Sequence, residues 1–172
     1  MEIYTIGHST RSLEEFVNLL QVHAITQLID IRTIPRSRHN PQYEQEALEK
    51  SLPMHGIDYE YLKVLGGLRT KVKESINTGW RNQSFRNYAD YMQTNDFVDG
   101  IEQLIKMADK KRTAIMCAEA VPWRCHRSLV GDALVVRQVN VCDIISAGNV
   151  KEHTLTSFAV TDGIVITYPG DR

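Results

Sequence analysis

The 172-residue sequence lacks most of the features that mark secreted, membrane or repeat proteins. It has only three cysteines, an odd number that cannot all pair within one chain, so a disulfide-stapled secreted scaffold is not expected. No run of about 18 apolar residues occurs, and no charged and then apolar leader follows Met1. These absences predict a soluble, cytoplasmic protein with no membrane partner and with reduced thiols.

The sequence also lacks an excess of either charge sign, because 20 basic and 21 acidic residues give a formal net charge of −1. Without an overall basic field, tight nucleic-acid binding through charge alone is not expected. Internal repeats, low-complexity segments and C-x₂₋₄-C pairs are also missing, which excludes repeat architectures and the common structural zinc motifs. The length and the 42% hydrophobic content suit one domain over residues 1–172.

Hydrophobic patterning predicts strands that alternate with helices. Strands are expected at 2–6, 27–31, 57–62, 113–116 and 139–145. Helices are expected at 45–55 and 84–93, with others starting at Ser12, Asp96 and near His126. This alternation predicts an α/β fold, a single domain with a mainly parallel sheet flanked by helices.

Two stretches depart from this alternation. Residues 155–160 and 164–168 flank a Thr-Asp-Gly turn and predict a C-terminal β-hairpin at an edge of the sheet. The basic, glycine-containing stretch 66–82 has no regular period and is the best candidate for a mobile lid over a site.

Polar residues follow four of the expected strands at the point where each strand ends. They are His8 and Ser9, Arg32, Gly66 and Gly67, and Cys117 and Glu119. Because the carboxyl ends of parallel strands share one edge of a sheet, we expect these residues to meet in one crevice.

Cys117 is the candidate nucleophile of this crevice. A helix that begins near His126 and the neighbouring guanidiniums would favour its thiolate, which is the reactive form of a thiol. Glu119, His8 and His126 are the candidates for proton transfer. The alternatives are that Cys117 is a small core residue and that Glu119 neutralises an arginine.

The other two cysteines have different expected roles. Cys125 lies in the polar loop and is a candidate resolving thiol, whereas Cys142 lies within an apolar strand and is expected in the core.

Arginines close to the same strand ends predict an anion site, because a guanidinium matches the geometry of phosphate and carboxylate groups. Arg127 lies at a helix start, where an anion is also favoured. The candidate ligand-binding residues are Arg32, Arg36, Arg38, Arg124, Arg127, Ser9, Gly66 and Gly67. The predicted ligand is an anionic small molecule or a nucleotide, and the alternative is that these arginines form salt bridges or are solvated.

Two further functions stay open at this point. His8, Cys117 and His126 are metal-ligand types, but the adjacent Cys125 and His126 would diverge by about 100° on a helix, so no metal ligand is assigned. A metal-dependent enzyme is therefore an alternative only.

A nucleic-acid- or protein-binding module is the other alternative. It would use the arginine loop around Arg36 and the segment 69–86, in which basic residues alternate with Trp80 and Phe85. The simpler interpretation is a solvated loop with one anchoring aromatic residue.

Motifs along nearly the whole chain resemble those of the DUF488 family. They are Thr5-Ile-Gly-His-Ser9, Leu28-Ile-Asp-Ile-Arg32 with Pro35-Arg-Ser-Arg38, Leu65-Gly-Gly67, and Met116-Cys-Ala-Glu119 with Cys125-His-Arg127. The resemblance implies that residues of these motifs occupy the family's signature positions. It implies no reaction and no cofactor, because the family's function is unknown. Asp143 departs from the pattern, since such proteins tend to have a histidine after the fifth strand.

A weaker, local similarity links Leu28–Arg32 and the Cys117 loop to rhodanese and cysteine-phosphatase domains. Six residues separate Cys117 from Arg124, which is longer than those loops allow, and Pro122 removes an amide donor. The similarity therefore implies a shared topology without shared catalysis. The sequence indicates neither a cofactor nor an oligomeric state.

Overall fold

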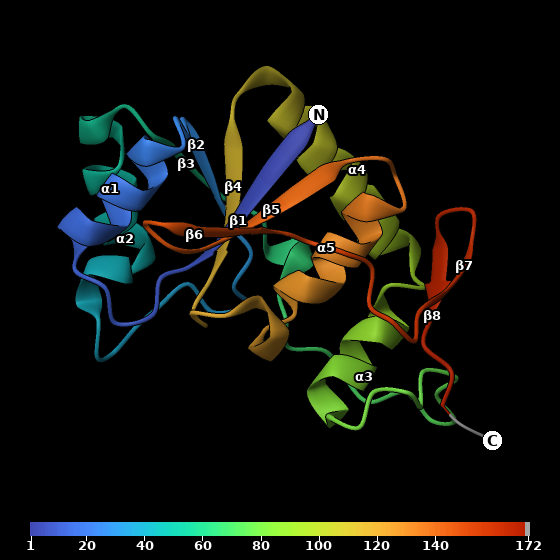
Figure 1. Ribbon diagram of the computed structural model, residues 1–172. Coiled ribbons are helices and arrows are strands. Elements are labelled where there is room, and N and C mark those ends of the chain that lie inside the picture. Colours follow the sequence, from blue (N-terminus) through green and yellow to red (C-terminus); the bar gives the residue numbers. More distant parts are fainter. Residues whose placement is uncertain (171–172) are drawn as a thin grey trace.

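The computed structural model describes residues 1–170 and contains a six-stranded sheet of strand order β3-β2-β4-β1-β5-β6 (Figure 1). Its strands are β1 (Glu2–Gly7), β2 (Gln27–Asp30), β3 (Asp58–Tyr61), β4 (Thr113–Cys117), β5 (Asn140–Ser146) and β6 (Asn149–Glu152). The first five run parallel, and β6 pairs antiparallel with β5. The α/β fold with a mainly parallel sheet is thus confirmed.

Helices cover both faces of the sheet. Helices α1 (Leu13–Val22) and α2 (Gln45–Ser51) lie on one face, and α4 (Asn95–Lys110) and α5 (Arg127–Val135) lie on the other (Figure 1). Successive residues of a strand point to opposite faces, so buried Ile3 packs in the core beside α4 and α5 while Tyr4 packs beside α1. Both cores are close to fully buried, and each large side chain in them contributes about 1.5–3 kcal/mol.

The remaining helical segments lie in the connections. Helix α3 (Gln83–Tyr91) lies beyond the carboxyl ends of the strands (Figure 1). Four single turns of 3₁₀ helix complete the described chain: η1 (Pro41–Tyr43), η2 (Pro53–His55), η3 (Lys63–Leu65) and η4 (Pro122–Arg124).

Helix ends agree with the sequence at some positions and differ at others. The Ser12 side chain accepts a hydrogen bond from the Glu15 amide at 3.1 Å, as the capping pattern predicts. Thr94, not Asp96, caps α4, so the prediction for Asp96 is wrong. The expected helix at 45–55 ends at Ser51, and a separate 3₁₀ turn begins at Pro53, because proline lacks the amide hydrogen that would continue the α-helix.

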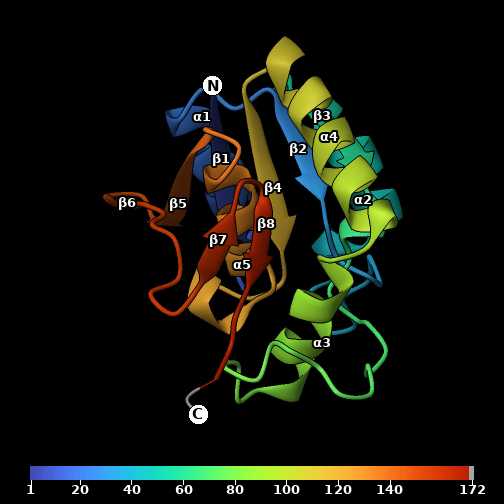
Figure 2. The same cartoon turned by 90° about the vertical axis from the view of Figure 1, so that its right-hand side faces the viewer.

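The C-terminal hairpin forms, but at a different place from the one expected. Strands β7 (Val160–Asp162) and β8 (Val165–Thr167) pair with each other in a separate two-stranded sheet. They lie against the α5 side of the molecule, where buried Ile166 and Tyr168 join the core (Figure 2). The edge of the sheet beside β5 is instead formed by β6, an exposed strand whose sequence Asn-Val-Lys-Glu has no apolar alternation to reveal it.

The register of the sheet brings the ends of its central strands level. Gly7 at the end of β1 pairs with Cys117 at the end of β4, and Asp30 at the end of β2 pairs with Met116. The loop after β4 then folds across β1 so closely that a Cβ on Gly7 would lie 1.5 Å from the carbonyl oxygen of Glu119. Glycine is required there. No helix among residues 1–170 combines the length and apolar character needed to cross a bilayer.

Candidate functional site

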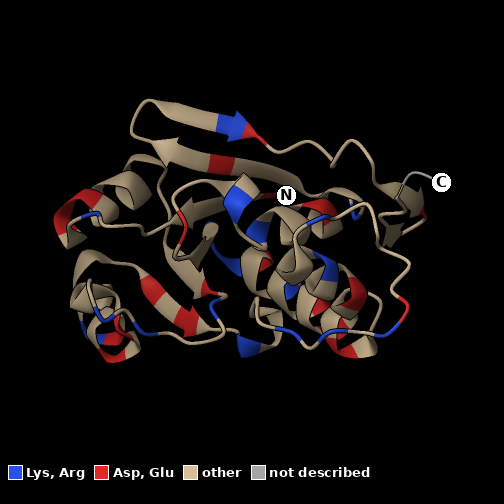
Figure 3. Cartoon of the chain, turned by 90° about the horizontal axis from the view of Figure 1, so that it is seen from below, with Lys and Arg blue, Asp and Glu red and all other residues tan. Residues whose placement is uncertain are grey.

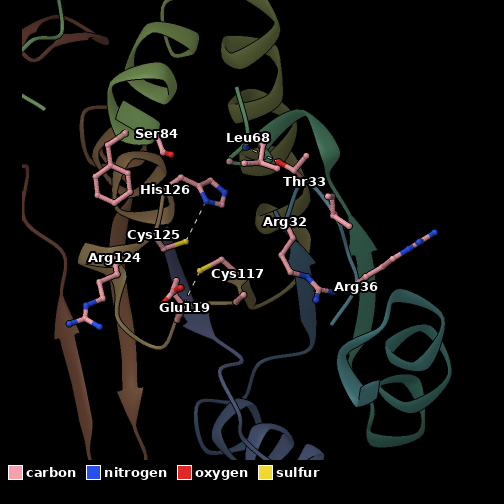
Figure 4. A pocket seen from close by; sticks show the side chains of 14 residues that line it. Arg32, Thr33, Arg36, Leu68, Ser84, Cys117, Glu119, Arg124, Cys125 and His126 are labelled. Atoms are coloured by element: carbon pink, nitrogen blue, oxygen red, sulfur yellow. Dashed lines mark hydrogen bonds between the residues drawn. The ribbon is translucent and has the colours of Figure 1, made fainter. Parts of the chain in front are cut away.

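A cavity of about 320 Å³ opens at the carboxyl ends of β2 and β4 (Figure 4). The loops after β2, β3 and β4, the start of α3 and the turn before α5 form its wall. Of the site residues predicted from the sequence, the cavity is lined by Arg32, Arg36, Gly67, Cys117, Glu119, Arg124, Cys125 and His126. His8, Ser9, Arg38, Gly66 and Arg127 do not line it.

Cys117 and Cys125 face each other in this cavity. Cys117 ends β4 and is 2% exposed, and Cys125 follows η4 and is 6% exposed. Their sulfur atoms point toward one another (Figure 4). When protonated, the Cys117 thiol also donates to the carbonyl oxygen of Glu119 at 3.7 Å.

The surroundings of the two thiols shift their pKa values in opposite directions. Burial disfavours the Cys117 thiolate, but the neighbouring Cys125 side chain and the positive charge of Arg127 outweigh it, so the pKa of Cys117 is lowered. Burial raises the pKa of Cys125 well above its ordinary value, and the adjacent Cys117 raises it further. Of the two, Cys117 therefore loses its proton more readily than Cys125.

Arg127 is a buried cation behind Cys117 rather than a wall of the cavity. It is 1% exposed and donates to the carbonyl oxygens of Glu119 at 3.2 Å and Ala120 at 3.1 Å. No Asp or Glu within the described part of the chain forms an ion pair with it. A buried guanidinium without a carboxylate favours an anion nearby, and Cys117 is in place to supply one.

His126 orients Cys125. Its Nε2 lies 3.0 Å from the carbonyl oxygen of Ile31, which has no hydrogen to give, so Nε2 carries the proton. Burial lowers the pKa of His126 to about 4, which leaves the ring neutral and Nδ1 free to accept. Nδ1 lies 3.4 Å from the Cys125 sulfur, so the Cys125 thiol donates to it. Gly67 permits this arrangement, because a Cβ there would lie 2.6 Å from Nδ1.

His8 and Arg32 belong to a buried network beside the cavity. Arg32 donates to Asp30 through Nε at 2.9 Å and Nη2 at 2.7 Å, and to the Tyr43 carbonyl at 2.8 Å. His8 donates through Nδ1 to the Ser9 carbonyl at 2.8 Å, and its Nε2 lies 3.4 Å from Nη1 of Arg32. Burial lowers the pKa of His8. Both ring nitrogens of His8 are thus engaged, whereas Arg32 still borders the cavity.

The exposed charges lie at the rim. Arg36 and Arg124 project from opposite sides of the cavity, and Glu119 lies between Cys117 and Arg124 (Figure 4). The Glu119 carboxylate pairs with neither Arg32 nor Arg127. Seen from this edge, Lys and Arg segments are interspersed with Asp and Glu segments across the middle of the molecule (Figure 3). Arg38 is exposed outside the cavity.

Sequence reasoning missed part of the wall, namely Thr33, Ile34, Leu68, Ser84, Phe85 and Ala118. Ser84 and Phe85 open α3, and their amides are capped by the Asn82 side chain at 2.8 and 3.2 Å. The Asn82 cap could have located the start of this helix. It could not have shown that the helix lies over the strand ends.

The segment 66–82 is anchored at three points. Arg69 stacks 3.6 Å above the Tyr91 ring and donates to the carbonyl oxygens of Gly66 and Val64. Buried Asn77 bonds to Asp90 at 2.7 Å, and Trp80 packs edge-on against aromatic neighbours. These contacts hold the segment that the sequence predicts to be a lid.

The described residues do not form the ligand set that a metal-dependent enzyme would need. Among residues 1–170, no three His, Cys, Asp or Glu side chains gather in a way that could hold an ion. The nitrogens of His8 and His126 are instead engaged by neighbouring groups.

Comparisons with known proteins complete the description. No curated protein and no solved structure matches the chain, so the local similarity to rhodanese and cysteine-phosphatase domains gains no support. The family model described as "Domain of unknown function DUF488" matches residues 12–134, well over half of the chain. The chain therefore belongs to the DUF488 family.

Proposed function

We propose that this protein is an enzyme that binds a small anionic molecule or a nucleotide in the cavity and attacks it with the Cys117 thiolate. One observation carries the proposal: the Cys117 sulfur lies in the cavity wall with the buried, carboxylate-free guanidinium of Arg127 behind it.

The assignment of Cys117 as the nucleophile is supported by the buried positive charge of Arg127, which has no carboxylate partner. Arginine side chains carry a positive charge in proteins, and the Arg127 donors reach only carbonyl and hydroxyl oxygens, so no carboxylate cancels this charge. The thiolate is the reactive form of cysteine, and a nearby cation stabilises it. Cys117 therefore has the environment of a reactive thiol rather than that of an inert core cysteine.

The anionic substrate is supported by the rim. Arg36 and Arg124 are exposed there, and Arg32 adds a third guanidinium whose Asp30 partner satisfies only part of its donors. A cavity of about 320 Å³ is at the lower end of the range for small-molecule sites. Glu119, exposed beside Cys117, would give or take a proton during the reaction.

A nucleic-acid-binding module is supported less well. Arg69 and Trp80, which that hypothesis needs at the surface, are engaged by Tyr91, backbone carbonyls and an aromatic cluster. Steep weakening of binding with salt would still identify such a module.

Selective alkylation tests the proposed function. Iodoacetate, an anion, is compared with neutral iodoacetamide at low salt, and the modified cysteine is located by peptide mass spectrometry. Cys117 should prefer iodoacetate more strongly than Cys142 does in the same molecule, and phosphate or AMP should slow its reaction. The Arg36→Ala and Arg124→Ala variants should lose part of this preference, and Cys117→Ser should remove the protected site. Equal reactivity of Cys117 and Cys142, with no protection, would contradict the proposal.

A further inference from the structure

We infer that Cys117 and Cys125 work as a dithiol that exchanges with a small disulfide bearing carboxylates, an assignment that rests on the proposed function of the same cavity. A nucleophile alone needs one cysteine. Here two thiols from different elements, the end of β4 and the turn before α5, line one cavity with their sulfur atoms facing each other (Figure 4).

The two thiols have unequal surroundings, which suits the two steps of exchange. Cys117 lies beside the buried Arg127 cation and is set up to attack. Cys125 keeps its proton and directs it to Nδ1 of His126, 3.4 Å away. Thiol–disulfide exchange needs one thiolate to open the substrate disulfide and a second thiol to release the product.

Cys142 shows that this arrangement is specific to the pair. It lies on β5, and its nearest polar partner is the Glu2 carboxylate at 3.6 Å. Burial and the charge of Glu2 raise the pKa of Cys142 to about 11. The chain thus contains its own control, a thiol that loses its proton less readily.

The rim selects the substrate class. Exposed Arg36 and Arg124 on opposite sides of the cavity would bind carboxylates of a disulfide whose sulfur reaches Cys117. Between the two cysteines the chain forms a loop with one 3₁₀ turn and no longer element. Movement of this loop would bring the two facing sulfurs to the 2.05 Å or so of a bond.

The chemistry balances without another reactant. The Cys117 thiolate attacks one sulfur of the substrate disulfide, forming a mixed disulfide and expelling one substrate thiolate. The Cys125 proton, held against His126, passes to that thiolate. The Cys125 thiolate then attacks the Cys117 sulfur, forming the internal disulfide and expelling the second substrate thiolate, which takes a proton from water. Two protein sulfurs are oxidised and two substrate sulfurs are reduced, and the reverse reaction restores the dithiol.

Oxidised glutathione is the probe that tests this inference. The full-length protein is incubated with it at low salt, quenched with acid and mapped by mass spectrometry. We expect a Cys117–Cys125 disulfide in the wild type and in Cys142→Ser. We expect a mixed disulfide on Cys117 that accumulates in Cys125→Ser, and neither product in Cys117→Ser. Neutral bis(2-hydroxyethyl) disulfide should react about tenfold more slowly, because it lacks the charge attracted by the rim.

The results separate this inference from the proposed function. If the wild type stops at the mixed disulfide as Cys125→Ser does, or if Cys142 joins the product, the dithiol is overturned. An equal rate with the neutral disulfide overturns the substrate class. If Cys117 still shows anion-sensitive alkylation in those cases, the proposed function stands. If Cys117 neither exchanges nor alkylates, both fail.

Discussion

The Nε2 atom of His126 lies 3.0 Å from the carbonyl oxygen of Ile31, and this contact joins the start of α5 to the residue after β2. Because a carbonyl can only accept, the contact fixes which imidazole nitrogen carries hydrogen. The other nitrogen then orients the Cys125 thiol. A backbone carbonyl on one side of the cavity thus controls a thiol on the other.

Gly67→Ala should disturb this contact without adding or removing a polar group. The new Cβ would lie 2.6 Å from Nδ1 of His126, so the ring must move away from Cys125. We expect a loss of about 1–3 kcal/mol in the free energy of unfolding, measured with urea, as for overpacking elsewhere. The matched control is Gly148→Ala, where a Cβ would meet nothing within 4 Å. A neutral Gly67→Ala would contradict the close packing of His126.

Acid should destabilise the protein through His126. Its folded-state pKa is about 4, because burial disfavours the imidazolium, whereas an unfolded histidine has a pKa near 6.5. The unfolded chain therefore binds the proton first, and stability falls as the pH drops from about 6.5 toward 4, by at most about 1.4 kcal/mol per pH unit. Urea unfolding of the wild type and His126→Asn should show a shallower acid slope in the variant, and parallel slopes would rule out this role.

Alkali should destabilise the protein through His153. Burial opposes its charge, but hydrogen bonds and ion pairs with Asp132 and Asp143 outweigh burial and raise its pKa to about 9. This contribution is complete below pH 6.5 or so and is lost as the pH rises through 9. The His153→Gln variant should therefore be less stable than the wild type at pH 6. Between pH 7 and 9.5 its free energy of unfolding should fall by less than that of the wild type. The exposed His39→Gln variant is the control, and identical profiles for both variants would disprove the network.

The fold could be predicted further than the site. Apolar strands and the Ser12 cap are local signals, and they located β1 and the start of α1 correctly. The edge strand β6 escaped prediction, because an exposed polar strand has no hydrophobic pattern.

At the site, the grouping of Cys117, Cys125 and His126 could be predicted from the sequence. All three lie at the ends of regular elements, at the same edge of the sheet. It could not show that Arg127, one residue farther along, points under the loop to backbone carbonyls and away from the cavity. Side chains of neighbouring residues at a helix start point about 100° apart. A shift of one position along the chain therefore separates a side chain that lines the cavity from one that supports its wall.

The pH dependence of Cys117 alkylation, followed at peptide resolution in the wild type and in Arg127→Met, tests the central claim most directly. Because Arg127 stabilises the thiolate, the wild-type apparent pKa should lie below the roughly 8.5 of a free thiol and should rise in the variant. Cys142 in the same samples reports any general unfolding. An apparent pKa at or above the free value, unchanged by Arg127→Met in a folded protein, would contradict the account.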